Sequence, residues 1–172
     1  MPMDSPRLSE FRELAAAHLE SAYNLARWLV RDPMIADDVV QDAMLRALRY
    51  YHGFRGENAR AWLLQIVRNV ALTRLKRGGA ETTTEDSTAD ALEGAHDGPE
   101  TALMRQDDQR LLHALLAGLP VELRECLILR EIEELSYKEI ARVVDAPIGT
   151  VMSRLWRGRK LLVQAARAAE SV

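Results

Sequence analysis

The sequence contains a single cysteine, few aromatic residues and no long apolar run, and each deficit excludes a class of protein. Because Cys126 stands alone, no disulfide can form within the chain, which favours a reducing compartment. We interpret Cys126 as a small apolar residue on a buried helix face. Aromatic residues make up 5% of the chain, which fits helical packing better than a β-sandwich or a barrel. The longest apolar run, residues 111–119, is about half of a membrane span, so we expect no direct insertion into a membrane.

Catalytic machinery is also missing from the sequence. The four histidines are scattered, no nucleophile is spaced from a base as in a catalytic pair, and no glycine-rich phosphate loop is present. Three neighbouring carboxylates, Asp37, Asp38 and Asp42, have no histidine at ligand spacing, and a helix start favours acids anyway. The N-terminus lacks the basic and apolar regions of a secretory signal. We therefore expect a cytoplasmic protein that is not an enzyme and that needs no cofactor or metal.

The acidic charge is concentrated in one segment. The chain has a formal net charge of -3, yet residues 81–108 hold nine acids and one base, a charge of -8 that leaves +5 for the remainder. The segment is rich in Thr, Ser, Asp, Gly and Pro and has no hydrophobic period, which predicts a flexible acidic linker at residues 81–107. It separates two small domains, residues 1–80 and 108–172. The composition fits two interpretations of this linker equally well: a solubilising spacer and a mimic of a nucleic-acid strand.

Hydrophobic spacing predicts helices throughout the first domain. Apolar residues recur every three or four positions from Leu8 onward, and Asp32 followed by Pro33 is a typical helix start. The helix that follows has an apolar side and an acidic side, whereas the last helix of the domain is basic. Residues 1–54 carry -2 and residues 55–77 carry +5. Separate acidic and basic surfaces on one domain suggest two different partners.

Two aromatic residues, Phe54 and Trp62, bracket the loop before this basic helix. Aromatic side chains beside a cationic groove hold single-stranded nucleic acid by base stacking. They are also ordinary core residues at a helix-loop junction, and the residues alone favour that interpretation. Asn69, among apolar neighbours on the same helix, is likewise more typical of a surface amide than of a base reader.

The last third of the chain predicts a helix-turn-helix. Ser136 and Glu139 form a capping box that starts one short helix, and Pro147 is a typical first residue of the next. Val151 and Leu155 face inward in that second helix. Its outward face carries polar, basic and aromatic side chains: Thr150, Ser153, Arg154, Trp156, Arg157 and Lys160. In a helix-turn-helix such a helix enters the major groove of DNA. There an arginine side chain can hydrogen-bond to guanine, and other basic side chains can contact phosphates.

Three stretches are recognisable, in this order: "ADDVVQDAMLRALR", "FRGENARAWLLQIVRNVA" and "LSYKEIARVVDAPIGTVMSRLWRGRK". They resemble successive signatures of the extracytoplasmic-function (group 4) sigma factors of bacterial RNA polymerase. The resemblance covers residues 11–162 apart from the linker. It implies an all-α fold, in which two small helical domains, one like sigma region 2 and one like the region 4 helix-turn-helix, are joined by the flexible acidic linker. It also favours the strand-mimic interpretation of that linker.

The same resemblance implies roles for three sets of residues. The set that docks on the clamp helices of the largest subunit of core RNA polymerase is Asp38, Val39, Val40, Gln41 and Asp42. The set that binds the melted -10 element of promoter DNA is Phe54, Asn58, Trp62, Arg68 and Asn69. The outward face from Thr150 to Lys160 reads the -35 element. An anti-sigma factor is a further implied partner.

Two residues depart from the family pattern. Met152 stands where the family often has Lys or Arg, which removes a phosphate contact, and Gly158 stands where Ala is common, which weakens the helix by up to about 1 kcal/mol. The resemblance implies a promoter-specificity subunit that binds core polymerase and directs initiation through -10 melting and -35 recognition. The alternative is a stand-alone helix-turn-helix regulator, which would bind duplex DNA tightly and specifically without polymerase.

Overall fold

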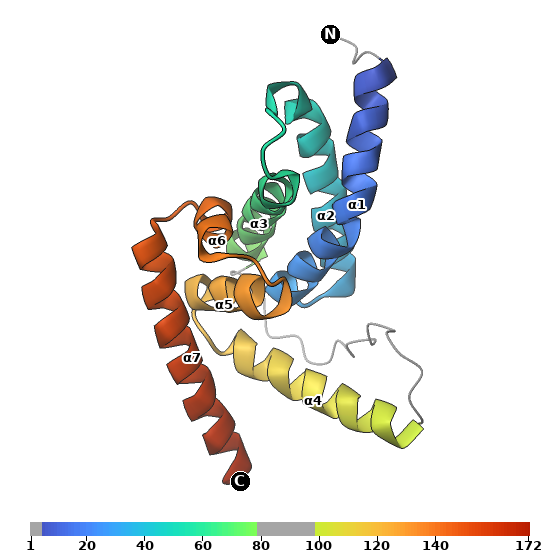
Figure 1. Ribbon diagram of the computed structural model, residues 1–172. Helices are drawn as coiled ribbons and strands as arrows, with labels where there is room; N and C mark the ends of the chain where they lie inside the picture. Colours follow the sequence, from blue (N-terminus) through green and yellow to red (C-terminus); the bar gives the residue numbers. More distant parts are fainter. Residues whose placement is uncertain (1–4, 79–98) are drawn as a thin grey trace.

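The structure is a computed structural model that describes residues 5–78 and 99–172, and in the second range it describes side chains from residue 105 onward. Every regular element in these ranges is a helix, as the sequence predicted (Figure 1). Most of the segment predicted as an acidic linker lies at residues 79–98, outside the described ranges. None of the described helices combines the length and the apolar composition needed to span a bilayer.

The first module consists of three packed helices and a short 3-10 turn. These elements are α1 (Ser5–Val30), α2 (Pro33–Tyr50), η1 (Tyr51–Gly53) and α3 (Ala59–Gly78). The start of α2 is as predicted, because the Asp32 carboxylate accepts hydrogen bonds from the backbone N–H of Met34 at 2.9 Å and of Ile35 at 3.4 Å. Pro33 is the first helical residue. This cap sets the reversal that lets α1 and α2 pack side by side.

The apolar faces of α1, α2 and α3 share one core. Buried side chains at its centre are Leu25, Leu29, Val39, Leu64 and Val67. Ile35 is exposed, because Ala36 takes the inward position at the start of α2. The inward face of α2 continues through Ala43 and Ala47. These small side chains let α1 and α3 approach closely.

The second module is built around a helix-turn-helix. Its elements are α4 (Pro99–Ala117), α5 (Val121–Leu127), the π-helical turn η2 (Ile128–Ile132), α6 (Tyr137–Val144) and α7 (Ile148–Glu170). α4 begins inside the segment predicted as a linker, so that residues 99–107 are helical. The Gly- and Thr-rich composition that predicted the linker ends at Gly98, and Pro99 is a favourable first residue of a helix.

The turn between α6 and α7 agrees with the sequence prediction to within one residue. Ser136 Oγ accepts a hydrogen bond from the N–H of Glu139, and the Glu139 carboxylate accepts one from the N–H of Ser136, both at 3.1 Å, which confirms the capping box. Asp145 ends α6 with φ 53°, in the left-handed region that glycine usually takes. Pro147 precedes α7 instead of opening it, so the helix begins one residue later than predicted.

Gly158 is a packing residue, which corrects the expectation that it only weakens α7. It is buried, and a Cβ at this position would lie 3.1 Å from Leu127 Cδ1 and 3.2 Å from Leu127 Cγ. Both distances are shorter than ordinary van der Waals contact. Because α5 packs against α7 here, an alanine at residue 158 requires Leu127 to move.

The two modules pack against each other. α6 lies against α3, and α5 and η2 contact α1 (Figure 1). Apolar side chains of both modules, such as Val67 of α3 and Ile140 of α6, belong to one continuous core. On the far side of this contact, the rings of Trp28 in α1 and His113 in α4 stack with centroids 3.9 Å apart. Part of α3 is therefore covered by the second module.

Candidate nucleic-acid and polymerase interfaces

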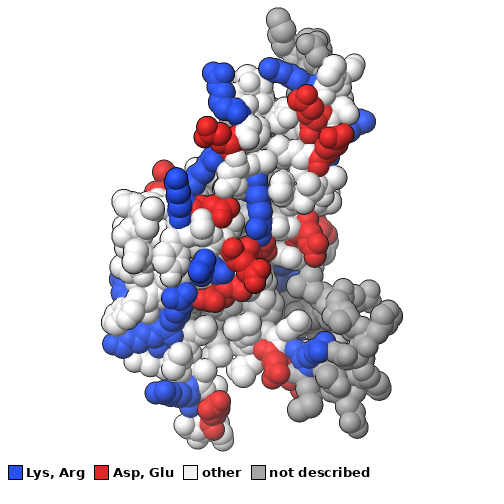
Figure 2. Space-filling view, in the orientation of Figure 1, with Lys and Arg blue, Asp and Glu red and all other residues white. Residues whose placement is uncertain are grey.

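The outward face of α7 presents the residues expected to contact duplex DNA. Val151 and Leu155 are buried, as predicted, which turns the opposite side of the helix toward solvent. The exposed members of the predicted set are Ser153, Trp156, Arg157 and Lys160, and the half-buried members are Thr150 and Arg154. Basic side chains follow the part of the surface that α7 forms (Figure 2). The helix therefore has a cationic outer side on an apolar support.

Trp156 is the most conspicuous apolar group on this face. Its side chain is 64% exposed, and the Lys160 ammonium lies 5.1 Å from its ring centroid. A large exposed ring beside basic side chains suits a partner that presents both apolar and anionic groups. Met152, at a position where the family often has Lys or Arg, is also exposed on this helix. At that position α7 therefore presents an apolar group in place of a cation.

Two arginines of α7 are used by the fold. Arg154 is half-buried and lies beside the Cys126 thiol, which differs from the fully outward position predicted for it. Burial raises the pKa of Cys126 to about 11, so the thiol stays protonated and acts as a packing group. Arg159 pairs with Glu131 at 2.7 Å, and this hydrogen bond raises the pKa of the arginine.

The aromatic residues expected at the -10 site form a cluster of their own. Phe54 and Trp62 are half-buried, with ring centroids 4.7 Å apart, and both lie near Tyr51 at 6.0 and 6.4 Å. Tyr51 in turn contacts Phe11 edge-on at 5.4 Å. The arrangement supports the core-aromatic interpretation, because these rings hold the loop after η1 against α3. Each ring keeps a partly accessible surface at the start of that helix.

Asn58 and Arg68 are engaged by the second module. Asn58 Oδ1 accepts a hydrogen bond from the N–H of Ala61 at 3.1 Å, and its Nδ2 donates to the Glu139 carboxylate at 3.1 Å. Arg68 donates to both carboxylate oxygens of Glu125, at 2.7 and 2.9 Å, and this contact raises the pKa of the arginine. Sequence reasoning missed these partners because they lie 81 and 57 residues away along the chain.

The acidic surface of α2 contains fewer of the predicted docking residues than expected. Asp38 and Gln41 are exposed and Asp42 is half-buried, with an ion pair to Arg46 at 3.3 Å. Val39 is fully buried and Val40 nearly so, because both face α1 and α3 in the core. In this structure these two valines therefore belong to the core and present little surface to a partner.

Two exposed apolar residues, which the sequence reasoning missed, belong to the same surface. Met34 is 78% exposed and Leu45 is 67% exposed. Together with Asp38 and Gln41 they recur at intervals of three or four residues, so all four share one face of α2. Their signal in the sequence was apolar character on the acidic side of a helix. We name this face, consisting of Met34, Asp38, Gln41 and Leu45, the exposed α2 face.

Comparison with known proteins places both modules in one family. Residues 14–81 match the model of sigma-70 region 2, and residues 109–162 match that of sigma-70 region 4. The chain is 38% identical over 145 residues to RNA polymerase sigma-H factor of Pseudomonas aeruginosa, covering 79% of this chain and 75% of that one. It is 35% identical over 147 residues to ECF RNA polymerase sigma-E factor of Haemophilus influenzae, covering 80% and 77%.

Solved structures show the same architecture. The sigma factor RpoE in complex with the anti-sigma factor NepR from Bartonella quintana is similar with a TM-score of 0.75 at 25% identity, over 92% of this chain and 97% of that one. CnrH, in complex with the cytosolic domain of CnrY, is similar in fold with a TM-score of 0.68 at 24% identity, over 92% and 88%.

An all-α chain with a helix-turn-helix in its second module, matched along both modules to polymerase subunits, is a transcription initiation factor. The chain belongs to the sigma-70 family, in its extracytoplasmic-function group, and it directs transcription initiation by RNA polymerase. The stand-alone regulator considered as an alternative is not favoured, because the first module matches sigma-70 region 2.

Proposed function

We propose that the two modules read the two elements of a promoter while the chain is held on core polymerase. The first module, residues 1–80, contacts the melted -10 element through α3 and the loop before it. The second, residues 108–172, contacts the -35 element through α7. The observation that carries this proposal is the outer side of α7, where Trp156 and Arg157 are exposed while Val151 and Leu155 anchor the helix.

The exposed α2 face is the proposed contact with the clamp helices of the largest polymerase subunit. It combines the exposed apolar side chains of Met34 and Leu45 with the acid Asp38 and the amide Gln41. Mixed apolar and acidic character suits a partner helix that carries apolar and basic groups. On this proposal the protein acts in the cytoplasm as a non-catalytic subunit.

An anti-sigma factor is the proposed regulatory partner. The structures similar to this chain were solved with such partners, RpoE with NepR and CnrH with the cytosolic domain of CnrY. The similarity extends over 92% of this chain in both cases. A chain of the same architecture offers a partner the same arrangement of the two modules.

Docking is tested by measuring the affinity of the chain for core polymerase, for example by fluorescence polarisation of labelled protein. Leu45→Asp and Asp38→Arg are expected to weaken binding by about tenfold or more, since each disrupts the centre of a contact surface. Glu20→Arg, an exposed charge reversal on α1, is the matched control and should leave the affinity unchanged. Equal affinity for all three variants would show that α2 is not the docking surface.

DNA reading is tested by gel shift with and without core polymerase. The proposal expects specific promoter binding only with polymerase, because each module alone is only slightly basic. Tight specific duplex binding by the free chain at physiological salt would instead support the stand-alone regulator.

A further inference from the structure

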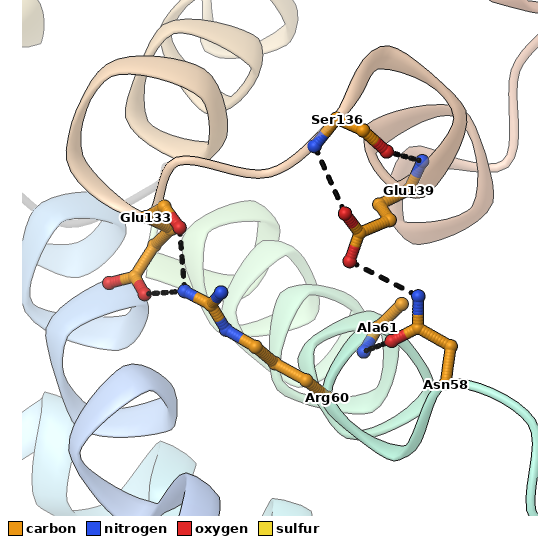
Figure 3. A network of polar contacts seen from close by, with 6 residues as sticks. All are labelled: Asn58, Arg60, Ala61, Glu133, Ser136 and Glu139. Atoms are coloured by element: carbon orange, nitrogen blue, oxygen red, sulfur yellow. Dashed lines mark hydrogen bonds and ion pairs between the residues drawn. The ribbon is translucent and has the colours of Figure 1, made fainter.

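Hydrogen-bond donors along α3 and directly before its first residue face three glutamates of the second module. Figure 3 shows two of these glutamates, Glu133 and Glu139, with their donors Arg60 and Asn58. The pairs are Asn58 with Glu139, Arg60 with Glu133 and Arg68 with Glu125. Arg60 Nη2 donates to the backbone oxygen of Glu133 at 2.6 Å and to its carboxylate at 2.9 Å. The glutamates come from α5, from the loop after η2 and from α6, so separate elements converge on one helix.

The two arginine–glutamate pairs are largely shielded from water, whereas the contact between Asn58 and Glu139 is exposed. Glu125 is 0% exposed and Glu133 is 6% exposed, while the side chains of Arg68 and Arg60 are 17% and 32% exposed. A buried carboxylate requires a counter-charge, so Glu125 depends on Arg68 and Glu133 depends on Arg60 across the module boundary. The hydrogen bond from Asn58 also lowers the pKa of Glu139, which keeps that carboxylate ionised.

Charge complementarity extends beyond the three pairs. Residues 55–77, which include α3, carry +5, whereas residues 121–145, which supply the three glutamates, hold seven acids and four bases and carry -3. Residues 146–172 carry +4 and include the outer side of α7. The charge of the second module is thus unevenly distributed along the chain, and its acidic stretch supplies the partners of the basic helix of the first module.

We propose that the three glutamates occupy the place of a nucleic-acid strand on α3, so that the modules must separate before this helix binds single-stranded DNA. Carboxylate and phosphate oxygens accept the same bidentate hydrogen bonds from arginine, so one set of donors serves both partners in turn. The proposal rests on the proposed -10 function of α3 and adds Arg60 as a residue that contacts the strand. Within residues 5–78 and 99–172 nothing covers the outer side of α7, so closure of these modules blocks the single strand only.

The test compares two triple variants of the full chain that remove the same number of charges. The interface variant is Glu125→Gln, Glu133→Gln and Glu139→Gln, in which glutamine keeps the size of each side chain and can still complete the capping box. The control variant is Glu122→Gln, Glu131→Gln and Glu134→Gln, three exposed acids of the second module. The probe is a fluorescent single-stranded DNA of random sequence, titrated at physiological salt.

Separation of the modules is measured by energy transfer between dyes on Glu20→Cys in α1 and Arg167→Cys in α7. Both positions are exposed, whereas Cys126 is buried and stays unlabelled. The interface variant is expected to show a lower transfer efficiency than the control variant. It is also expected to bind the strand about tenfold more tightly, which corresponds to a control population in which about nine-tenths of the molecules are closed. Adding Arg60→Ala to the interface variant should reverse most of that gain.

Equal transfer efficiency and equal strand affinity in the two triple variants would overturn the proposal. If the interface variant loses helical circular dichroism, the single change Glu133→Gln replaces it, with the same direction expected. The -10 function is tested separately by initiation from the assembled polymerase. If the wild-type chain initiates normally while the two triple variants have the same transfer efficiency and strand affinity, closure is rejected but the -10 function of α3 is not.

Discussion

The polar faces of α3 and α7 have similar chemistry and opposite surroundings. Both helices carry arginines on the side opposite an apolar stripe. Arg157 of α7 is exposed and, within the described residues, makes no ion pair, whereas Arg68 of α3 is paired with the fully buried Glu125. The difference shows that a basic helix face is available to nucleic acid only if the tertiary structure leaves it uncovered.

The largest effect is expected from breaking the buried pair. Glu125→Ala leaves the Arg68 charge without a partner and should lower the free energy of unfolding by about 3–5 kcal/mol. Glu131→Ala breaks the exposed pair with Arg159 and should lower it by at most about 1 kcal/mol. Urea unfolding followed by circular dichroism measures both. Similar losses would contradict the contrast between a covered and an open face.

The next effect concerns reading by α7. Arg157→Ala should reduce initiation from promoters with an intact upstream element by roughly tenfold, since one bidentate base contact is worth about 1–3 kcal/mol. The unfolding free energy should not change, because the side chain is exposed. Run-off transcription with core polymerase provides the measurement, and Arg167→Ala, further along α7, is the control. If the two variants initiate equally well, Arg157 does not read the element.

Alanine substitutions at two glycines of α7 should have smaller effects on stability, and these effects should be opposite in sign. Gly158→Ala should destabilise the protein by about 1 kcal/mol because its Cβ would press on Leu127. Gly149→Ala meets nothing within 4 Å and should stabilise the helix by up to about 1 kcal/mol. Thermal unfolding of the two variants tests this, and stabilisation by both would show that α5 does not restrict residue 158.

The smallest effect is a pH dependence at the stacked pair Trp28 and His113. Burial, together with the charges of Arg27 and Arg31, lowers the pKa of His113. Since the folded-state pKa lies below the usual 6.5, the contribution to stability is present above that pH and is lost as the pH falls through the folded-state value.

His113→Phe keeps a ring for stacking and removes this titration. The urea midpoint of the variant should therefore fall less than that of the wild type between about pH 7.5 and about pH 5.5. His18, whose pKa burial also lowers, leaves part of the dependence in both proteins. An unchanged pH profile in the variant would show that His113 is not a source of it.

Local features of the sequence predicted the fold well, and the reason is that they depend on near neighbours. The Asp32 cap, the Ser136 capping box and the inward places of Val151 and Leu155 follow from spacing within a few residues. The start of α4 was missed because composition alone assigned it to the linker.

The candidate site was predicted less completely, since exposure depends on what the rest of the chain covers. Val39 and Val40 fit the family signature for docking, yet the packing of α2 buries them. Asn58 and Arg68 were predicted as DNA contacts, while the glutamates that hold them are far away in the sequence. Gly158 looked like a weakness of α7 because its neighbour Leu127 belongs to another helix.

The central claim is that the chain, once on polymerase, reads one promoter element with each module. The most direct measurement is transcription of purified genomic DNA by core polymerase with and without the chain, with mapping of the RNA 5′ ends. The account predicts new start sites that share two sequence elements at a fixed spacing, and loss of preference for the upstream element in Arg157→Ala. Start sites without a shared upstream element, or an unchanged preference in that variant, would contradict it.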